Sequence, residues 1–188
     1  MARLILASSS ARRRELLEQL GLVFDIYSPD IDESVQAGES VADYVERLAC
    51  AKAEAVQLQY PDAIVIAADT SLGVDQEILG KPESKQHAFE MWEKISGRKH
   101  DVYTAVCVRT NTQISSIVVR TEVEFQHLSL NDMEAYWATS EPIGKAGAYA
   151  IQGIAARYIP RIEGSYSNVV GLPLHETVQL LQAVKALN

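Results

Sequence analysis

The chain has 188 residues, of which 47% are hydrophobic and 22% charged, and its formal net charge is −8. This length suits one domain with its own core, so we expect residues 1–188 to form a single domain. The negative charge argues against a nucleic-acid-binding surface, which needs distributed Lys and Arg. No apolar run approaches the roughly 20 residues of a membrane helix, so no membrane partner is expected either.

Two features favour a cytoplasmic location. The apolar stretch Leu4-Ile5-Leu6 is too short for the core of a signal peptide, and serines and arginines follow it at once. Cys50 and Cys107 are the two cysteines, and they form neither a CxxC pair nor a cluster with zinc spacing. Two thiols in a chain without a signal peptide indicate a reducing compartment.

Strand-like apolar runs alternate with helical patterns, which predicts an α/β fold. In chain order, the predicted elements are a strand at 3–7, a helix at 10–20, a strand at 23–28, a polar loop at 29–39, a helix at 40–58, a strand at 63–68, a hairpin-like segment up to 82, a helix at 84–96, strands at 102–109 and 114–127, a helix at 129–139, a strand at 154–162 and a helix at 174–186. Ser40 and Ser129 are expected to begin their helices, and Gly21 and Gly97 to end theirs.

The first candidate site is the junction of the first strand and helix, Ser8-Ser9-Ser10-Ala11-Arg12-Arg13-Arg14. A helix N-terminus exposes free N–H groups and a partial positive charge, which suits phosphate. Three arginines in that first turn oppose the helix dipole, and an anion between them would relieve the penalty. A serine-capped helix with solvated arginines explains the same residues. The segment is not a P-loop, because the glycines and the Lys-Ser/Thr pair are missing.

Lys52 occupies an unusual position in the helix predicted at 40–58. At about 100° per residue it falls in the middle of the apolar stripe that includes Tyr44 and Leu48. A lysine there must extend to the helix edge, pair with an acid or face a cleft.

Asp69 follows the apolar run Ile64 to Ala68, which predicts a strand buried on both faces with a carboxylate at its end. Ligands of open α/β sheets bind beyond the carboxyl ends of strands. Asp69 is therefore a candidate general base or metal ligand. An aspartate that begins a turn or caps Ser71 is the alternative.

Two glycine-containing segments complete the candidates. Gly80-Lys81-Pro82 combines close backbone approach with a phosphate-sized charge, although an ordinary turn explains it equally well. The run from Gly144 to Gly153 lacks dinucleotide-binding spacing, but it contains Gln152. A glutamine amide offers a donor and an acceptor, which match the imide edge of uracil or thymine.

Taken together, these segments resemble the Maf family of nucleotide pyrophosphatases over nearly the whole chain. The matching segments are Leu6-Ala7-Ser8-Ser9-Ser10-Ala11-Arg12-Arg13, the stretch around Glu33, Arg47-Leu48-Ala49 through Lys52, Ala68-Asp69-Thr70, Gly80-Lys81-Pro82, Ser96-Gly97 with His100, Tyr103-Thr104-Ala105-Val106, the Gln152 segment and Val170-Gly171-Leu172-Pro173. The family pattern usually has proline where this chain has Ala11. That difference removes no phosphate ligand.

The resemblance implies a two-lobed Maf/ITPase-like α/β fold with an elongated mixed sheet, flanking helices and an active cleft between the lobes. It also implies a homodimer that hydrolyses nucleoside triphosphates with a divalent cation, Mg²⁺ or Mn²⁺. The segments around Thr70 and Gln152 look like the branch that acts on dTTP and UTP. The family's proton acceptor falls on Asp69, and its specificity positions fall on Arg12, Thr70 and Gln152.

On this basis we expect a triphosphate site in which a metal ion lies near Glu33 or Asp69. The residues expected to hold the phosphates are Arg12, Arg13, Lys52 and Lys81, with Ser8 and Ser10 at the helix start. Two alternatives stay open at this point. One is a pyrophosphatase for 7-methyl-GTP or another modified nucleotide, and the other is a non-catalytic regulator of septum formation.

Overall fold

The computed structural model describes residues 3–187, which are built around one seven-stranded mixed sheet. The strands are β1 (Leu4–Leu6), β2 (Asp25–Ile26), β3 (Ile64–Val74), β4 (Glu77–Leu79), β5 (Lys99–Arg109), β6 (Ile114–Glu124) and β7 (Arg161–Glu163). The α-helices are α1 (Ala11–Glu18), α2 (Val41–Gln59), α3 (Lys85–Ile95), α4 (Leu130–Trp137), α5 (Tyr166–Val170) and α6 (Leu174–Ala183). Two 3-10 helices, η1 (Ala146–Ala148) and η2 (Ile154–Tyr158), lie between α4 and β7.

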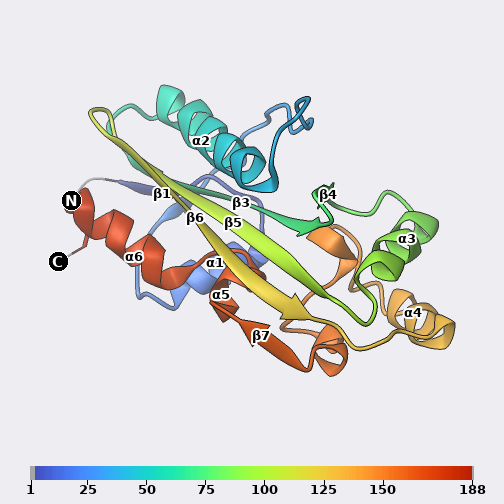
Figure 1. Cartoon of the computed structure of the whole chain (residues 1–188). Helices are drawn as coiled ribbons and strands as arrows, with labels where there is room; N and C mark the ends of the chain where they lie inside the picture. The colour runs from blue at the N-terminus through green and yellow to red at the C-terminus, as the bar shows by residue number, and fades with distance from the viewer. Residues whose placement is uncertain (1–2, 188) are drawn as a thin grey trace.

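The sheet has the order β2-β1-β3-β5-β6-β7, and β4 pairs with β3 off this path. β1 is parallel to β2 and β3, whereas the remaining pairs are antiparallel. Since β3, β5 and β6 are each 11 residues long, the sheet is elongated (Figure 1). The predicted mixed α/β architecture is confirmed.

The helices form two lobes along the sheet: α2, α5 and α6 flank the long strands in one lobe, and α3, α4 and η1 form the other (Figure 1). α2 packs on one face of β3 and β5, while α5 and α6 pack on the other face of β5 and β6 (Figure 1). α3, α4 and η1 gather at the far end of the long strands. The alternation of β3 separates two cores, because Val65 and Ala67 join the α2 cluster and Ile66 and Ala68 join the opposite one.

Serine caps define where the helices begin. In each case the serine hydroxyl accepts a hydrogen bond from the backbone N–H three residues on, as in helices α1, α2, α3, α4 and α5 after Ser10, Ser40, Ser84, Ser129 and Ser165. The predicted caps at Ser40 and Ser129 are therefore confirmed. Gly21 and Gly97 follow α1 and α3 at φ 69° and 68°, a left-handed conformation that ends a helix. No helix within residues 3–187 is long and apolar enough to cross a membrane.

The strand predicted at 154–162 is wrong for most of its length. Residues 154–158 form η2, and only Arg161–Glu163 pair as β7. The side chain of Glu141 explains this outcome, because it accepts hydrogen bonds from the first backbone N–H groups of η2. The strand predicted at 23–28 is limited to Asp25–Ile26, and the short helix α5 was not predicted.

The sequence predicted that Asp69 lies at a strand end, because it follows an apolar run. This prediction is wrong. β3 continues to Val74, so Asp69 is in the middle of an 11-residue strand and neither begins a turn nor caps one. The strand continues because Leu72 and Val74 remain buried, and because β4 folds back to pair with Leu72–Val74.

Gly147 tests the packing between the two lobes. An added Cβ would lie 2.2 Å from Cδ2 of Leu72, and the backbone φ is +64°. Gly147→Ala should therefore lower the free energy of unfolding by about 2–4 kcal/mol in urea denaturation. Gly144→Ala is the matched control, since Gly144 has φ +71° but no atom within 4 Å of an added Cβ. It should lose only about 1 kcal/mol, and equal losses would contradict the close contact.

Candidate active site

The site forms where β3 changes its neighbour. On one edge β3 pairs with β1 up to Ile66 and with β4 from Leu72. Among the described residues, no strand pairs with 67–71 on that edge, although the other edge is paired with β5 throughout. An unpaired edge leaves backbone donors and acceptors available to a ligand. The middle of β3 can therefore face a cavity without being a strand end.

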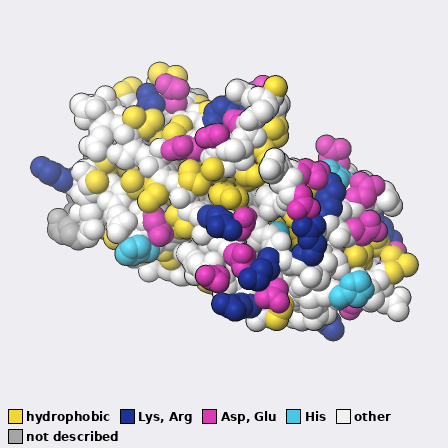
Figure 2. Space-filling model, in the orientation of Figure 1, with side chains coloured by type: hydrophobic (Ala, Val, Ile, Leu, Met, Phe, Trp, Pro, Cys, Tyr) yellow, Lys and Arg dark blue, Asp and Glu magenta, His cyan; other side chains and the backbone are white. Residues whose placement is uncertain are grey.

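A cavity of about 610 Å³ opens at this gap in β3. Its size is within the usual range for small-molecule sites. Figure 2 shows an indentation of the molecular outline between the α2 side and the α3 side. The structure brings all the predicted site residues to its walls, namely Ser8, Ser10, Arg12, Arg13, Glu33, Lys52, Asp69, Thr70, Lys81 and Gln152.

Arg13 is fixed by three different partners. Its Nε donates to the carbonyl of Gly171 at 2.8 Å, Nη2 donates to Oγ1 of Thr70 at 3.0 Å, and Nη1 reaches Oγ of Ser8 at 3.4 Å. Burial lowers the pKa of Arg13, while the charge of Asp69 opposes that shift. An arginine starts from so high a pKa that it stays charged, so this guanidinium is a fixed positive group in the cavity wall.

The three arginines of α1 have different environments. Arg12 donates from Nε to the carbonyl of Val170 at 3.4 Å, and burial lowers its pKa. Arg14 turns outward and pairs with Glu18 at 3.6 Å. The carbonyls that receive Arg12 and Arg13 belong to the C-terminal end of α5, where helices carry partial negative charge. The arginines therefore lie between two helix ends, and the solvated alternative holds only for Arg14.

Lys52 pairs with two carboxylates. Its Nζ lies 2.6 Å from Oδ1 of Asp69 and 2.7 Å from Oε1 of Glu33, and Lys81 approaches the other oxygen of Glu33 at 4.0 Å. The side chains of Lys52 and Asp69 are each 11% exposed. Asp69 meets Lys52 because the odd-numbered residues of β3 face α2. Pairing with acids at a cleft is thus the observed solution for this lysine.

The charge state of Glu33 follows from these neighbours. Burial alone would raise the pKa of Glu33, but the hydrogen bond and charge of Lys52, with contributions from Lys81 and Arg13, lower it on balance. Glu33 is therefore a carboxylate at neutral pH. Two carboxylates and two lysines alternate in sign along this wall of the cavity.

Thr70 lies on the opposite face of β3 from Asp69. Its Oγ1 accepts from Arg13 and contacts Oγ1 of Thr104 at 2.9 Å, and Thr104 donates to the carbonyl of Asn168. The Asn168 amide nitrogen donates in turn to the carbonyl of Val102 and to Oγ1 of Thr121. This buried polar network connects Arg13 to the centre of the sheet.

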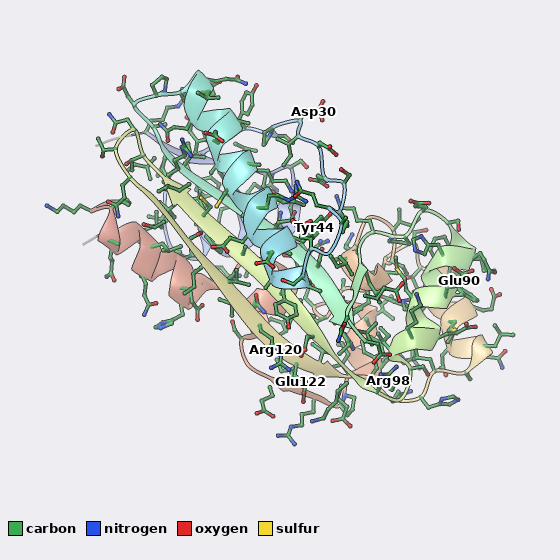
Figure 3. All side chains as sticks on the ribbon, turned by 45° about the horizontal axis from the view of Figure 1, so that its top comes forward. Asp30, Tyr44, Glu90, Arg98, Arg120 and Glu122 are labelled. Atoms are coloured by element: carbon green, nitrogen blue, oxygen red, sulfur yellow. The ribbon has the colours of Figure 1, made fainter. Side chains whose placement is uncertain are left out.

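Sequence patterns did not identify Asn168, Tyr44 or Lys145. Tyr44 lies on the same stripe of α2 as Lys52, and Figure 3 shows it on the half of α2 nearer to α3. Its hydroxyl donates to the carbonyl of Glu33, and burial with the charges of Asp69 and Glu33 raises its pKa to about 12. Lys145 is the basic residue of the glycine-containing run and lines the cavity. Burial lowers its pKa, and the nearby positive charge of Arg12 lowers it further. The sequence signal for Tyr44 was an aromatic residue on a helix stripe, and that for Lys145 was a lysine beside a glycine. No sequence signal pointed to Asn168.

Glu33 and Asp69 are the residues that could hold a metal ion. Their carboxylate oxygens are the hard ligands that Mg²⁺ and Mn²⁺ prefer, and both converge on the position of one cation, the Lys52 ammonium. Within residues 3–187 no group of three His, Cys, Asp or Glu could hold a metal. The donor set therefore fits an ion that takes its remaining ligands from phosphate and water.

The Lys52 pair can be tested through stability. Lys52→Met should lower the free energy of unfolding by about 2–4 kcal/mol, because Asp69 would stay buried without a counter-charge. Lys85→Met is the control, since Lys85 forms an exposed pair with Glu134 and should cost less than about 1 kcal/mol. Adding Asp69→Asn to Lys52→Met should recover part of the loss in urea denaturation. A single Lys52 variant as stable as the control would contradict this ion pair.

The chain is similar to known proteins over nearly its whole length. The family model described as Maf-like protein matches residues 3–184. A dTTP/UTP pyrophosphatase of Acinetobacter baylyi is 66% identical over 183 residues, which cover 97% of this chain and 100% of that relative. A dTTP/UTP pyrophosphatase of Vibrio parahaemolyticus is 50% identical over 180 residues, with 95% of each chain covered.

One solved structure shares the fold at low sequence identity. The structure of the Staphylococcus aureus Ham1 protein aligns with a TM-score of 0.54 and 14% identity, and the alignment covers 97% of each chain. The overall fold is thus shared by two proteins of very different sequence. The match to the family over residues 3–184 agrees with the resemblance found in the motifs, and the chain belongs to the Maf-like protein family.

Proposed function

We propose that this protein hydrolyses nucleoside triphosphates, with dTTP and UTP as substrates, to the monophosphate and pyrophosphate. The names of its relatives at 66% and 50% identity support the substrate class. The observation that carries the proposal is the convergence of Arg13, Lys52 and Lys81 with Asp69 at the unpaired part of β3. A triphosphate needs several fixed cations, and its hydrolysis needs a base near them.

In this proposal the phosphates bind along the cationic wall. Arg12, Arg13, Lys52 and Lys81 line the cavity beside the start of α1, where Ser8 and Ser10 lie. Ser8 already accepts from the backbone N–H of Ser10. The guanidinium of Arg13 is oriented before substrate binds, so little conformational freedom is lost on binding.

In this proposal a water molecule attacks the α-phosphorus. The new bond joins the water oxygen to that phosphorus, the α–β anhydride bond breaks, and pyrophosphate leaves with the bridging oxygen. Asp69 accepts the proton of the attacking water, which completes the balance of triphosphate plus water to monophosphate, pyrophosphate and a proton. Lys52, 2.6 Å from Asp69, orients that carboxylate and contributes positive charge near the phosphates.

Glu33 and Asp69 would hold the divalent cation that the Maf family uses. A divalent cation at these carboxylates would supply positive charge that neutralises the phosphates. Lys52 pairs with both carboxylates, so an ion held there would share them with the lysine ammonium.

Gln152 is an exposed residue of the cavity wall, and in this proposal it offers its amide to the base. Thr70 shapes the neighbouring wall while it holds Arg13. The homodimer, the single domain of residues 1–188, the cytoplasmic location and a link to septum formation stay predictions.

Asp69→Asn tests the proposed base. The amide preserves the size of the side chain but cannot accept the proton, so turnover of dTTP should fall by about two or more orders of magnitude. Pyrophosphate release with Mg²⁺ or Mn²⁺ present measures the loss, and circular dichroism checks the fold. Asp101→Asn, on β5 outside the cavity, is the control and should retain turnover. Near-normal hydrolysis by Asp69→Asn would remove Asp69 from this role.

Gln152→Ala tests base selection. Loss of the amide should weaken discrimination between dTTP or UTP and other triphosphates by about tenfold, with little effect on phosphate binding. A panel of canonical triphosphates and 7-methyl-GTP, scored for pyrophosphate release, measures the ranking. An unchanged ranking would exclude Gln152 as the base-reading residue. A wild-type preference for 7-methyl-GTP would instead favour the modified-nucleotide alternative.

A further inference from the structure

The backbone near Gln152 donates hydrogen bonds to two residues that do not line the cavity, Tyr136 and Glu141. Tyr136 is 3% exposed and lies in α4, and Glu141 is partly buried in the segment that follows α4. Neither side chain is among the residues that line the cavity. Tyr136 contacts the backbone that precedes Gln152, and Glu141 contacts the backbone that follows it.

The contacts surround Gln152 in sequence. The hydroxyl of Tyr136 accepts from the backbone N–H of Ala150 at 3.1 Å. The two carboxylate oxygens of Glu141 accept from the N–H groups of Ile154 at 2.9 Å and Ala155 at 3.2 Å. Tyr136 and Glu141 are themselves joined by a 2.7 Å hydrogen bond. Hydrogen bonds thus hold the backbone at Ala150, two residues before Gln152, and at Ile154 and Ala155, two and three residues after it.

Steric fit makes this attachment tight. A Cβ added to Gly153 would lie 2.1 Å from Oε2 of Glu141, so the carboxylate packs directly on the backbone of the residue after Gln152. A glycine is the residue that fits there. The side chain of Gln152 is consequently displayed from a backbone with little freedom to shift.

The charge of Glu141 suits this role. Burial alone would raise the pKa of Glu141, but the hydrogen bonds from Tyr136, Ile154 and Ala155 lower it on balance. A carboxylate accepts with both oxygens, and here each oxygen faces a backbone donor. Burial, followed by the bond to Glu141, raises the pKa of Tyr136, which keeps the phenol protonated.

We propose that Glu141 and Tyr136 are positioning residues for base selection, which set the reach of Gln152 into the cavity through the backbone of residues 150–155. This inference rests on the proposed function, because it deepens how that site selects its nucleotide. It assigns these two residues no contact with substrate. It predicts that their loss alters recognition of the base and leaves the phosphate chemistry at Asp69 in place.

Two conservative variants and one control test this assignment. Glu141→Gln leaves an amide NH₂ facing a backbone donor, and Tyr136→Phe removes the hydroxyl alone. Each should raise the KM for dTTP by about tenfold, change kcat less than about twofold, and lower the preference for dTTP over dCTP. Glu134→Gln is the control, because Glu134 is on the same helix but exposed and paired with Lys85. It should match the wild type in all three quantities.

A double-mutant cycle separates positioning from general loosening. In a Gln152→Ala background, Tyr136→Phe should leave the dTTP to dCTP preference unchanged, because the residue that it positions is gone. An equal effect in both backgrounds, or equal losses for all nucleotides, would overturn the proposal. Melting temperatures of all variants show whether the fold is retained.

Binding of the non-hydrolysable α,β-imido analogues of dUTP and dCTP, measured by calorimetry, applies the same cycle without turnover. If the wild type releases no pyrophosphate, the proposed function fails, and the binding cycle still decides whether Glu141 and Tyr136 act through Gln152. If the wild type is active but both variants keep its selectivity in binding and turnover, the positioning proposal alone fails.

Discussion

The change of partner along β3 is the constraint on which the site depends. β1 ends beside Ile66 and β4 begins beside Leu72, and the five residues between them have no strand on that edge among those described. Alternation then sends neighbouring side chains to opposite faces, so Asp69 meets Lys52 of α2 and Thr70 meets Arg13 of α1. One strand thereby positions a carboxylate and an arginine partner at the same cavity.

Two cations of the cavity, Lys52 and Arg13, are fixed by the protein before any ligand binds. Lys52 lies between two carboxylates, and Arg13 is held by a carbonyl and two hydroxyls. Several basic residues outside the cavity pair with acids at the surface, as Arg98 does with Asp75 and Arg120 with Asp101. Figure 3 shows Arg98 and Arg120 beside the long strands. An acidic chain can therefore bind a polyanion, because its positive charge is concentrated where its fold opens.

Local chemistry was enough to predict much of this arrangement. Serine caps and stop glycines placed the helices, and Lys52 was recognised because a charge on an apolar stripe needs a partner. The position of Asp69 within β3 was not predictable from the apolar run, since the strand is prolonged by pairing with β4. Asn168 and Glu141 were missed for a related reason. Their partners are distant backbone groups, which only the assembled fold brings near.

The position of the bound triphosphate is the most direct test of the central claim. A crystal structure with the α,β-imido analogue of dUTP should show the phosphates at residues 67–71 of β3, within hydrogen-bonding distance of Arg13, Lys52 and Lys81. The base should lie at Gln152. Phosphates bound elsewhere on the molecule, or a uracil ring at the cationic wall with the phosphates at Gln152, would contradict it.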